Sequence, residues 1–428
     1  MSLHSTSTYK IYFIISCLFY LSACAPVTSS ETLMPSAQSS CSGEFIKDKY
    51  IVKFKDGSFK TYRFKDREKF KSEIVEAHLN DIDYIEYDQK FEIAPPSKIE
   101  AKFADNVVFT PQAVDNWGLR MIQAPGAWQN GYFGQGVTVA VIDSGVDINH
   151  PLLINQIAYN PGESGTDSLG HDKKTNGLDD DGNGYVDDYA GFDFVTNSGK
   201  MVDTVSHGTH VAGIIAAEHN STVVSNSSVQ GLAPRAKILP VRFLDTSGGT
   251  LEGALGALEY AKRRGAQIIN ASWGGEGCSR ALADKVQEIT AAGIIFVVAA
   301  GNNGSNLDFF PEFPAVFRSA LQVTVGSSGT MDGMSSFSNY SRTFVNLFAP
   351  GFNIVSTLPN SRIGAESGTS MATPYVAAAA AVLLSVKPSA SPQEVLNALY
   401  SSVDTNPEYQ NSTSGRLNVA RAVNQMLN

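Results

Sequence analysis

The chain has 428 residues, of which 43% are hydrophobic and 17% are charged. This composition is ordinary for a globular protein of two or three domains and excludes a mainly disordered or collagen-like chain. With 32 basic and 42 acidic residues the formal net charge is −10, which argues against a nucleic-acid partner.

Residues 1–23 have the pattern of a secretory signal peptide. Lys10 precedes an apolar run at 11–21, which is too short to span a membrane because a spanning helix needs about 20 residues. The run ends in Leu-Ser-Ala before Cys24, a pattern that resembles the bacterial lipobox, in which the cysteine becomes lipid-modified. We therefore expect an exported bacterial protein with a lipid anchor on Cys24. The alternative is plain cleavage near Ala23 with an unmodified cysteine.

A tether and a small module follow the leader. Residues 24–43 are rich in Ser, Thr and Pro, a composition typical of a flexible tether. In residues 44–93 apolar and charged side chains alternate as in half-buried strands, and Asp56-Gly57 is a turn signal for a hairpin. A small α/β module is therefore expected, with strands at 50–55, 58–64 and 83–93 and a helix at 67–79.

Residues 94–116 are interpreted as a processing linker and residues 117–428 as the main domain. In the main domain short apolar runs alternate with stretches that are compatible with a helix. Such alternation predicts an α/β fold with a doubly wound, mostly parallel sheet flanked by helices, in which ligands bind beyond the carboxyl ends of the strands. Strands are expected at 137–142, 237–243, 266–271, 293–300 and 320–325, and helices at 207–218, 251–264, 279–292, 373–386 and 391–401.

Two polar residues stand where such a site would form. Asp143 directly follows the strand at 137–142, although taken alone it fits a helix cap or a turn. His207 opens the segment His-Gly-Thr-His-Val-Ala-Gly at an expected helix start, and taken alone it fits a structural histidine. His207 and His210 also form an H-x-x-H pair, but a metal site there is disfavoured because no third zinc ligand is spaced nearby.

Ser370 lies in the segment Gly-Thr-Ser-Met-Ala-Thr-Pro, ahead of a long Ala-rich helix. Pro374 suits the first turn of a helix, where its missing N–H costs nothing. The free N–H groups and the dipole at a helix N-terminus favour a developing negative charge. Ser370 is therefore a candidate nucleophile, with a simple helix cap as the alternative.

Asp143, His207 and Ser370 follow one another in the chain order of subtilisin. The segments around them, Val-Ile-Asp-Ser-Gly-Val, His-Gly-Thr-His-Val-Ala-Gly and Gly-Thr-Ser-Met-Ala-Thr-Pro, resemble the motifs of the subtilisin-like serine proteases. The resemblance extends from about residue 117 to residue 422 and implies a serine endopeptidase. In that family's mechanism Ser370 would attack the peptide carbonyl, His207 would transfer the proton and Asp143 would orient the imidazole.

The resemblance also implies how a protein or peptide substrate is held. Asn302, in Ala-Ala-Gly-Asn-Asn-Gly, matches the family's oxyanion-hole asparagine, although alone it would fit a turn in a Gly-rich loop. The substrate is expected as an added strand that faces residues 243–250 across the cleft, with an apolar primary pocket. The residues expected to contact the substrate are Ser272, Trp273, Gly274 and Gly301.

An acidic loop at 176–188 has the spacing of a cation site. Oxygen-bearing side chains occupy alternate positions, as in the first half of an EF-hand loop, but the twelfth position is Ala190 rather than Glu. Five Asp within ten residues repel one another without a cation, so a structural Ca²⁺ is expected, with a solvated acidic turn as the alternative. The expected ligands are Asp179, Asp181, Asn183, Tyr185 and Asp188.

Residues 44–93 then resemble the inhibitory propeptide of this family, which docks on the enzyme and assists its folding. Cleavage within 94–116 would release the active enzyme, so we expect an exported zymogen that carries its propeptide as an intramolecular inhibitor. Beyond the lipobox only Cys41 and Cys278 remain, too few for a disulfide framework. These two cysteines either pair with each other or stay free.

Two alternatives of other classes stay open. The chain would be an inactive peptide-binding lipoprotein on the same fold, or a dedicated maturation protease for one partner. The intact triad and the oxyanion asparagine weigh against the first alternative, and we expect a general endopeptidase rather than the second.

Overall fold

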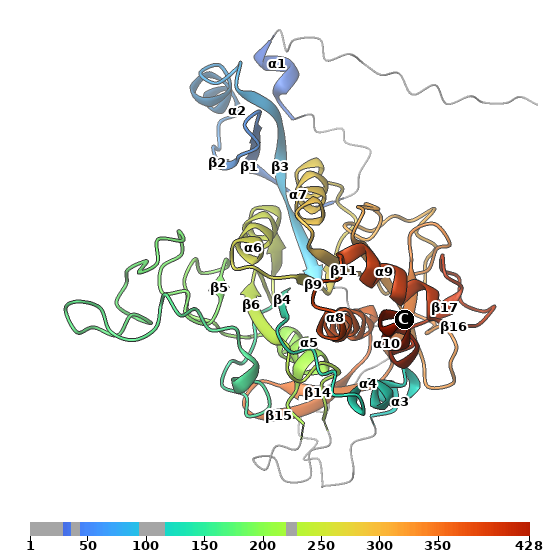
Figure 1. The fold of residues 1–428 in the computed structure, drawn as a ribbon. Helices are drawn as coiled ribbons and strands as arrows, with labels where there is room; N and C mark the ends of the chain where they lie inside the picture. Colours follow the sequence, from blue (N-terminus) through green and yellow to red (C-terminus); the bar gives the residue numbers. More distant parts are fainter. Residues whose placement is uncertain (1–28, 36–42, 94–115, 220–228) are drawn as a thin grey trace, which may run out of the picture.

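The computed structural model describes residues 29–35, 43–93, 116–219 and 229–428. They form a large α/β domain with a smaller module standing on one side of it (Figure 1). The expected signal peptide, the lipobox, Cys41 and nearly all of the processing linker lie outside the described residues.

A nine-stranded sheet forms the centre of the large domain, and its neighbouring strands are parallel except for one antiparallel pair at the edge. Side chains that alternate along a strand enter two different cores: Val139 and Val141 pack on one face of the sheet, and Ala140 and Ile142 on the other. Burial on both faces explains the continuous apolar runs in the sequence. In spatial order the strands are β16 (Asp404–Thr405), β17 (Gly415–Arg416), β13 (Leu347–Pro350), β12 (Gln322–Ser328), β11 (Ile295–Ala299), β9 (Ile268–Ala271), β4 (Thr138–Asp143), β6 (Lys237–Arg242) and β5 (Phe192–Asp193).

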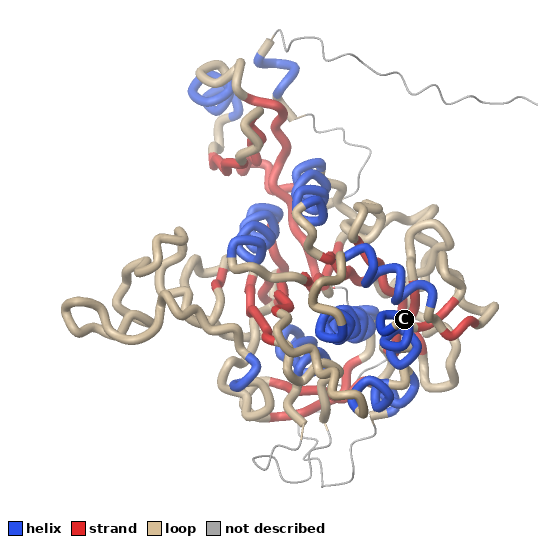
Figure 2. The backbone as a smooth tube through the Cα atoms, in the orientation of Figure 1, coloured by secondary structure: helices blue, strands red, loops and turns tan. Residues whose placement is uncertain are grey.

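Helices cover both faces of this sheet (Figure 2), which agrees with the expected architecture. One core joins the sheet to α5 (His207–Ala216), α8 (Thr369–Val386), α9 (Pro392–Ser401) and α10 (Val419–Leu427), and the other joins it to α6 (Leu251–Arg263) and α7 (Arg280–Ala291). The domain also contains α3 (Trp117–Met121), α4 (Ala124–Trp128), the 3₁₀ turn η2 (Ile154–Gln156) and the hairpin of β14 (Ile354–Leu358) and β15 (Arg362–Glu366).

Helix α8 differs from the expectation at its start. It begins at Thr369 rather than at residue 373, because Gly368 is its N-cap, so Ser370 is its second residue. Pro374 therefore lies inside the helix and not in its first turn, which corrects the sequence interpretation. Within the described residues α8 is the one helix that is long and apolar enough to cross a membrane. However, 89% of the helix is buried inside the protein, which is typical of a core helix.

The small module contains three antiparallel strands, β1 (Phe45–Phe54), β2 (Phe59–Arg63) and β3 (Ile82–Ile93), in the order β2-β1-β3. The helix expected at 67–79 is irregular: α2 (Arg67–Phe70) passes into a π-helical segment at Lys71–Val75. Tyr50 stacks on Phe70 in the core of the module, with the ring centroids 3.9 Å apart. A single-turn helix, α1 (Ser30–Leu33), lies against the same core.

Strand β3 extends from the module into the large domain (Figure 1). There it pairs with two short strands of that domain, β8 (Gly248–Thr250) and β10 (Trp273–Gly274), and β8 in turn pairs with β7 (Leu244–Asp245). The module and the domain thus share one hydrogen-bonded sheet.

Candidate active site

Asp143 and His207 form a buried hydrogen-bonded pair at the carboxyl end of the large sheet. Asp143 is the last residue of β4, and His207 is the first residue of α5. The distance from His207 Nδ1 to Asp143 Oδ1 is 2.8 Å. Burial alone would lower the pKa of His207, but the charge of Asp143 and this hydrogen bond outweigh burial and raise the pKa to about 9.

Glycines allow the strand and the helix to approach this closely. A Cβ atom on Gly208 would lie 2.1 Å from the carbonyl oxygen of Gly145 and 3.1 Å from Asp143 Cβ. A Cβ atom on Gly145 would lie 1.9 Å from the carbonyl oxygen of Val202, and the φ angle of Gly145 is +102°. Both motif glycines are therefore needed to bring the imidazole against the carboxylate.

Asp203 ties the two motifs together, a role that no sequence pattern had indicated. Its Oδ1 accepts a hydrogen bond from Ser144 Oγ at 3.0 Å, and its Oδ2 accepts one from the Thr209 backbone N–H at 2.9 Å. The Gly208 N–H donates to Ser144 Oγ at 3.0 Å. The residues that follow the aspartate and the histidine are thereby held to one half-buried carboxylate.

His210 has a structural role. Its Nε2 lies 2.9 Å from the carbonyl oxygen of Ile354 and 3.1 Å from that of Gly364. Burial lowers the pKa of His210, which favours a neutral ring that donates to these carbonyls. This arrangement gives no support to a metal site on the His207–His210 pair.

Ser370 is held at two points by Ser272. Ser370 Oγ donates to the Ser272 carbonyl oxygen at 3.2 Å, and Ser272 Oγ donates to the Ser370 carbonyl oxygen at 2.9 Å. Pro374 has no N–H, so the Ser370 carbonyl lacks its helical donor four residues on, and the Ser272 hydroxyl takes that place. Asn270 Nδ2 donates to Ser272 Oγ at 3.0 Å and fixes that hydroxyl.

The imidazole has one nitrogen available for chemistry. His207 Nε2 is buried and has no hydrogen-bond partner among the described residues. Hydrogen bonds between a catalytic base and its nucleophile are often long before substrate binds and tighten only in the complex. Nε2 is therefore the atom positioned to receive a proton.

Asn302 and the N-terminus of α8 form a pair of donors. Asn302 Oδ1 accepts hydrogen bonds from the backbone N–H and the hydroxyl of Thr369 at 2.8 and 2.9 Å, which fixes the orientation of the amide. A Cβ atom on Gly368 would lie 3.2 Å from Asn302 Nδ2 and 3.6 Å from the Ser370 nitrogen. Two N–H donors thus flank one glycine, as a site for a developing oxyanion requires.

The predicted substrate segment is a strand, and β3 already pairs with it. Glu92 lies opposite Gly274 in the antiparallel register of β3 with β10, and on the other side Phe91 lies opposite Gly249 of β8. The buried ring of Phe91 packs edge-on against Trp273, with the centroids 5.5 Å apart. The chain's own strand therefore lies between the two rims where substrate was expected.

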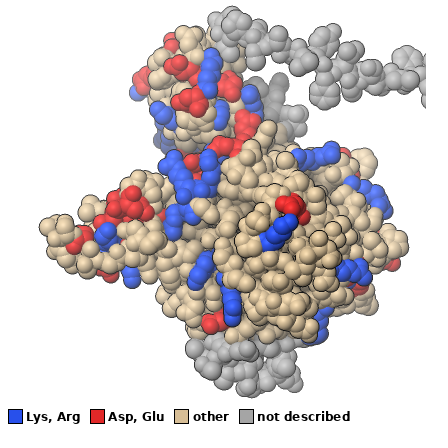
Figure 3. Space-filling view, in the orientation of Figure 1, with Lys and Arg blue, Asp and Glu red and all other residues tan. Residues whose placement is uncertain are grey.

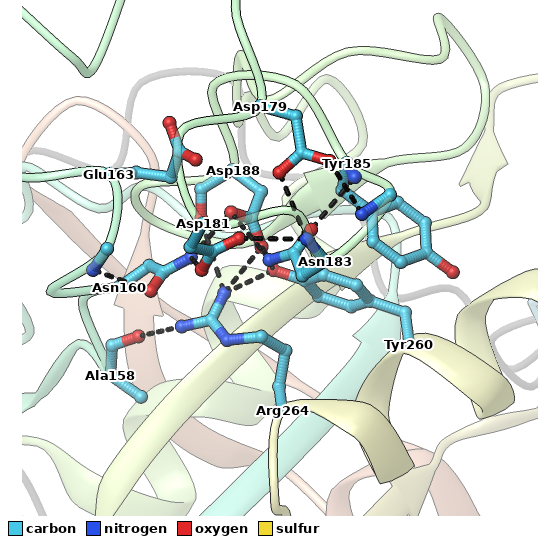
Figure 4. Close-up of polar contacts among 12 residues, drawn as sticks. Ala158, Asn160, Glu163, Asp179, Asp181, Asn183, Tyr185, Asp188, Tyr260 and Arg264 are labelled. Atoms are coloured by element: carbon cyan, nitrogen blue, oxygen red, sulfur yellow. Dashed lines mark hydrogen bonds and ion pairs between the residues drawn. The ribbon is translucent and has the colours of Figure 1, made fainter.

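The acidic loop holds three carboxylates close together (Figure 4). One oxygen each from Glu163, Asp179 and Asp181 lies within 4.8 Å of the others. Glu163 is fully buried, and its Oε2 has no hydrogen-bond partner among the described residues. Burial and the charges of neighbouring Asp residues raise the pKa of Glu163. No sequence pattern indicated Glu163, which precedes the loop.

The other expected ligands have different partners. Asp188 is buried and accepts hydrogen bonds from Tyr260 Oη at 2.7 Å and Arg264 at 2.8 Å (Figure 4). Asn183 donates its amide to Asp188, and its Oδ1 accepts the Tyr185 N–H at 2.8 Å. These residues brace the loop from the side of α6.

Cys278, which precedes α7, is disulfide-bonded. Cys41, for which the sequence left pairing with Cys278 open, lies outside the described residues. The nearby backbones of Gly43 and Gly277 are in close contact, since a Cβ atom on Gly43 would lie 2.7 Å from Gly277 Cα.

Comparison with known proteins identifies the family. The model of the subtilase family matches residues 134–419. The chain is 38% identical over 260 residues to the thermophilic serine proteinase of Bacillus sp. (strain AK1), which covers 60% of this chain and 55% of that protein. It is 36% identical over 276 residues to thermitase of Thermoactinomyces vulgaris, covering 64% of this chain and 84% of the relative. With subtilisin Savinase of Lederbergia lenta the identity is 35% over 285 residues, 66% of this chain and 89% of the relative.

The chain therefore belongs to the subtilase family and is a subtilisin-like serine endopeptidase. The match confirms the fold class and the enzyme class expected from the three motifs.

Proposed function

We propose that this chain hydrolyses internal peptide bonds with Ser370 as nucleophile, His207 as general base and acid, and Asp143 as the group that orients the imidazole. Ser370 Oγ forms a bond to the substrate carbonyl carbon and passes its proton to His207 Nε2. The C–N bond then breaks, and the leaving amine takes that proton from His207. Water attacks the acyl-enzyme by the same route and releases the acid and free Ser370.

The negative charge of the tetrahedral intermediate is stabilised by donors that are already in place. Asn302 Nδ2 and the Ser370 backbone N–H flank the same position beside Gly368. The single observation that carries the proposal is the 2.8 Å bond between His207 and Asp143, because it fixes the tautomer that leaves Nε2 to act as base.

The small module is proposed to be an intramolecular inhibitor, and its contacts with two helix N-termini support this role. The carboxylate of Glu86 accepts the backbone N–H groups of Arg280 at 3.1 Å and Ala281 at 3.3 Å, at the start of α7. Asp88 accepts the Glu252 N–H at 3.2 Å, at the start of α6. Carboxylates at helix N-termini are favourable partners, so the module is anchored where β3 enters the substrate cleft.

Charge pairing reinforces this contact. Figure 3 shows Lys and Arg side chains gathered at the junction of the module and the domain. Lys49, in β1, bridges Asp88 at 2.8 Å and Glu252 at 2.5 Å. Because β3 pairs with the strands on both sides of the cleft, it occupies the place that a substrate strand would need. Residues 44–93 would therefore have to be removed, by processing within 94–116, before substrate could bind.

A structural Ca²⁺ is proposed at the acidic loop, held by Glu163, Asp179 and Asp181. The buried, unpartnered Oε2 of Glu163 fits a hard cation, because burying an unpaired carboxylate is otherwise costly. The ion would supply positive charge and fix the loop, with no part in peptide hydrolysis. Asn183 and Tyr185 remain predicted ligands, whereas Asp188 has Arg264 as its counter-ion.

Export with a lipid anchor on Cys24 is proposed from the leader pattern alone. The mass of the N-terminal peptide of the mature protein tests it. A diacylglyceryl-modified Cys24 is expected, and an unmodified Cys24 or a different N-terminus would contradict it.

The decisive experiment for the activity compares the chain with its Ser370→Ala variant on casein and on a panel of peptides. General endopeptidase activity predicts cleavage of casein and of several peptides, lost in the variant. No cleavage by either protein would indicate a peptide-binding lipoprotein, and cleavage of one sequence only would indicate a dedicated maturation protease.

A further inference from the structure

Glu312 is a partly buried carboxylate that the proposed mechanism does not use, and it lies against two of the predicted substrate-contacting glycines. A Cβ atom on Gly274 would lie 3.7 Å from Glu312 Oε2, and one on Gly301 would lie 2.1 Å from it. Gly274 follows β9 and Gly301 follows β11, and these two strands are adjacent and parallel. The Glu312 carboxylate therefore lies close to the chain segments that follow both strands. The next residue, Phe313, exchanges backbone hydrogen bonds with Gly275 at 2.8 and 3.0 Å.

The two oxygens of this carboxylate have different surroundings. Oε1 accepts amide hydrogen bonds from Asn303 at 2.7 Å and from Asn339 at 3.0 Å. Oε2 is the carboxylate oxygen that lies near both glycines, and it has no hydrogen-bond or ion-pair partner among the described residues. One oxygen thus fixes the side chain, while the other faces the substrate segment.

No cation of the described chain compensates this charge. The polar neighbours of Glu312 are the neutral amides of Asn303 and Asn339, and the charged group that acts on it is another carboxylate, Glu276. Burial, with a contribution from the charge of Glu276, raises the pKa of Glu312 to about 7. A cation that arrives with the substrate would stabilise the ionised form of this group.

The register of β3 shows which part of a substrate would approach this oxygen. Glu92 lies opposite Gly274 and Ile93 lies opposite Trp273, so a peptide bound in the same antiparallel register places its next residue opposite Ser272. The Ser272 carbonyl accepts the hydroxyl of Ser370, so the peptide bond after that residue lies beside the nucleophile. Side chains alternate along a strand. The side chain of the substrate residue opposite Ser272 therefore faces the same side as that of the substrate residue opposite Gly274.

We propose that Glu312 selects substrates with a lysine or arginine side chain immediately before the scissile bond, by pairing its Oε2 with the substrate cation. This inference rests on the proposed peptidase function and names its substrate class. It replaces the expectation of a wholly apolar primary pocket. A charge-assisted hydrogen bond in a water-poor site favours a cation over a neutral side chain of the same length.

The test uses the full chain after activation, with the active fraction counted by titration with a sulfonyl fluoride. Peptide p-nitroanilides that differ only in their last residue, Lys, Met or Glu, are compared at about pH 9, where a carboxyl group with a pKa of about 7 is ionised. The variants are Glu312→Gln, whose carbonyl can still accept from Asn303 and Asn339, and Glu408→Gln, which removes one charge from an exposed loop between β16 and β17.

The wild type is expected to cleave the Lys peptide about tenfold or more faster than the Met peptide in kcat/KM. In Glu312→Gln the value for the Lys peptide should fall by about ten- to hundredfold, while that for the Met peptide stays within about threefold. Glu408→Gln should match the wild type on all three peptides.

Equal Lys-to-Met ratios in the wild type and in Glu312→Gln would overturn the inference, because a carboxylate that only braces the loop would alter both substrates alike. If Glu312→Gln does not fold, the ratio of kcat/KM for the Lys and Met peptides in the wild type tests the inference by itself. A wild-type preference for Met over Lys would then overturn it. Failure of the wild type to cleave any peptide would instead contradict the proposed function itself.

Discussion

The hydroxyl of Ser272 replaces a helical hydrogen bond that Pro374 removes from Ser370. A proline inside α8 leaves the carbonyl of the residue four positions earlier without a donor, and that residue is the proposed nucleophile. Ser272 Oγ donates to this carbonyl at 2.9 Å, while the Ser272 carbonyl accepts Ser370 Oγ. The two hydrogen bonds thereby hold the predicted substrate segment and the proposed nucleophile together.

The hydrogen bonds between Ser272 and Ser370 predict that substitutions at Ser272 and Pro374 have coupled effects. Ser272→Ala should lower the free energy of unfolding by about 1–3 kcal/mol and reduce kcat, because it leaves the buried Ser370 carbonyl unpaired. Pro374→Ala restores an N–H at the helical position, so in the double variant the Ser272→Ala loss should be smaller. Chemical denaturation of the four proteins, each as Ser370→Ala to prevent self-digestion, measures the coupling. Strictly additive losses would show that the two sites act independently.

The Asp143–His207 pair predicts an alkaline pH profile. His207 acts as base only when neutral, so kcat/KM should rise with pH through its pKa, which is raised to about 9 from the ordinary 6.5. In Asp143→Asn the charge that raises the pKa is absent while burial remains, so the rise should move to lower pH. The maximal rate should also fall by about 10⁴-fold.

The pH profile is measured with the Met peptide from about pH 5 to about pH 11. The Met side chain is uncharged, so ionisation of Glu312 does not change kcat/KM by pairing with a substrate cation. An identical midpoint in the wild type and in Asp143→Asn would contradict the assignment of the pair.

Glu86 predicts how firmly the module holds the enzyme inactive. Glu86→Gln weakens acceptance at the N-terminus of α7, so the unprocessed chain should show a shorter lag before peptidase activity appears. A several-fold change is expected, since such contacts contribute about 0.3–1 kcal/mol, more when buried. The matched control is Glu68→Gln, on an exposed face of α2. Equal lags in both variants would argue against docking through Glu86.

The acidic loop predicts calcium-dependent stability. Ca²⁺ at about 100 times its Kd should raise the free energy of unfolding by about 2.7 kcal/mol. Glu163→Gln should abolish that increase and, because it removes a buried unpaired charge, stabilise the calcium-free protein. Asp172→Asn, which alters an exposed acid that precedes the loop, should retain the full response. Thermal unfolding with EGTA and with Ca²⁺ checks this, and an unchanged response in Glu163→Gln would exclude Glu163 as a ligand.

Much of the fold and the site follows from local pattern. The β-branched run before Asp143 and the His-Gly-Thr-His segment predict β4 and α5 almost to their ends, because hydrophobic periodicity and motif glycines act locally. The start of α8 was missed, since the donor that compensates Pro374 comes from Ser272, about a hundred residues away.

Residues that join a site only through the tertiary fold have no local sequence pattern that predicts their role. Asp203, Glu163 and Glu312 stand in loops without a periodic pattern, and each acquires its role from contacts that include side chains far away in the sequence. The irregular helix of the module was likewise read as regular, because apolar spacing alone does not distinguish an α-helix from a π-helical turn.

Ser370 is the proposed nucleophile, and the proposed peptidase mechanism depends on it. Its most direct test is stoichiometric labelling of the activated enzyme with a sulfonyl fluoride, followed by mass spectrometry of the peptides. One sulfonyl group per active chain is expected on Ser370, with peptidase activity lost in proportion to labelling. Full activity in a chain whose Ser370 is sulfonylated, or a proportional loss with the label on another residue, would contradict it.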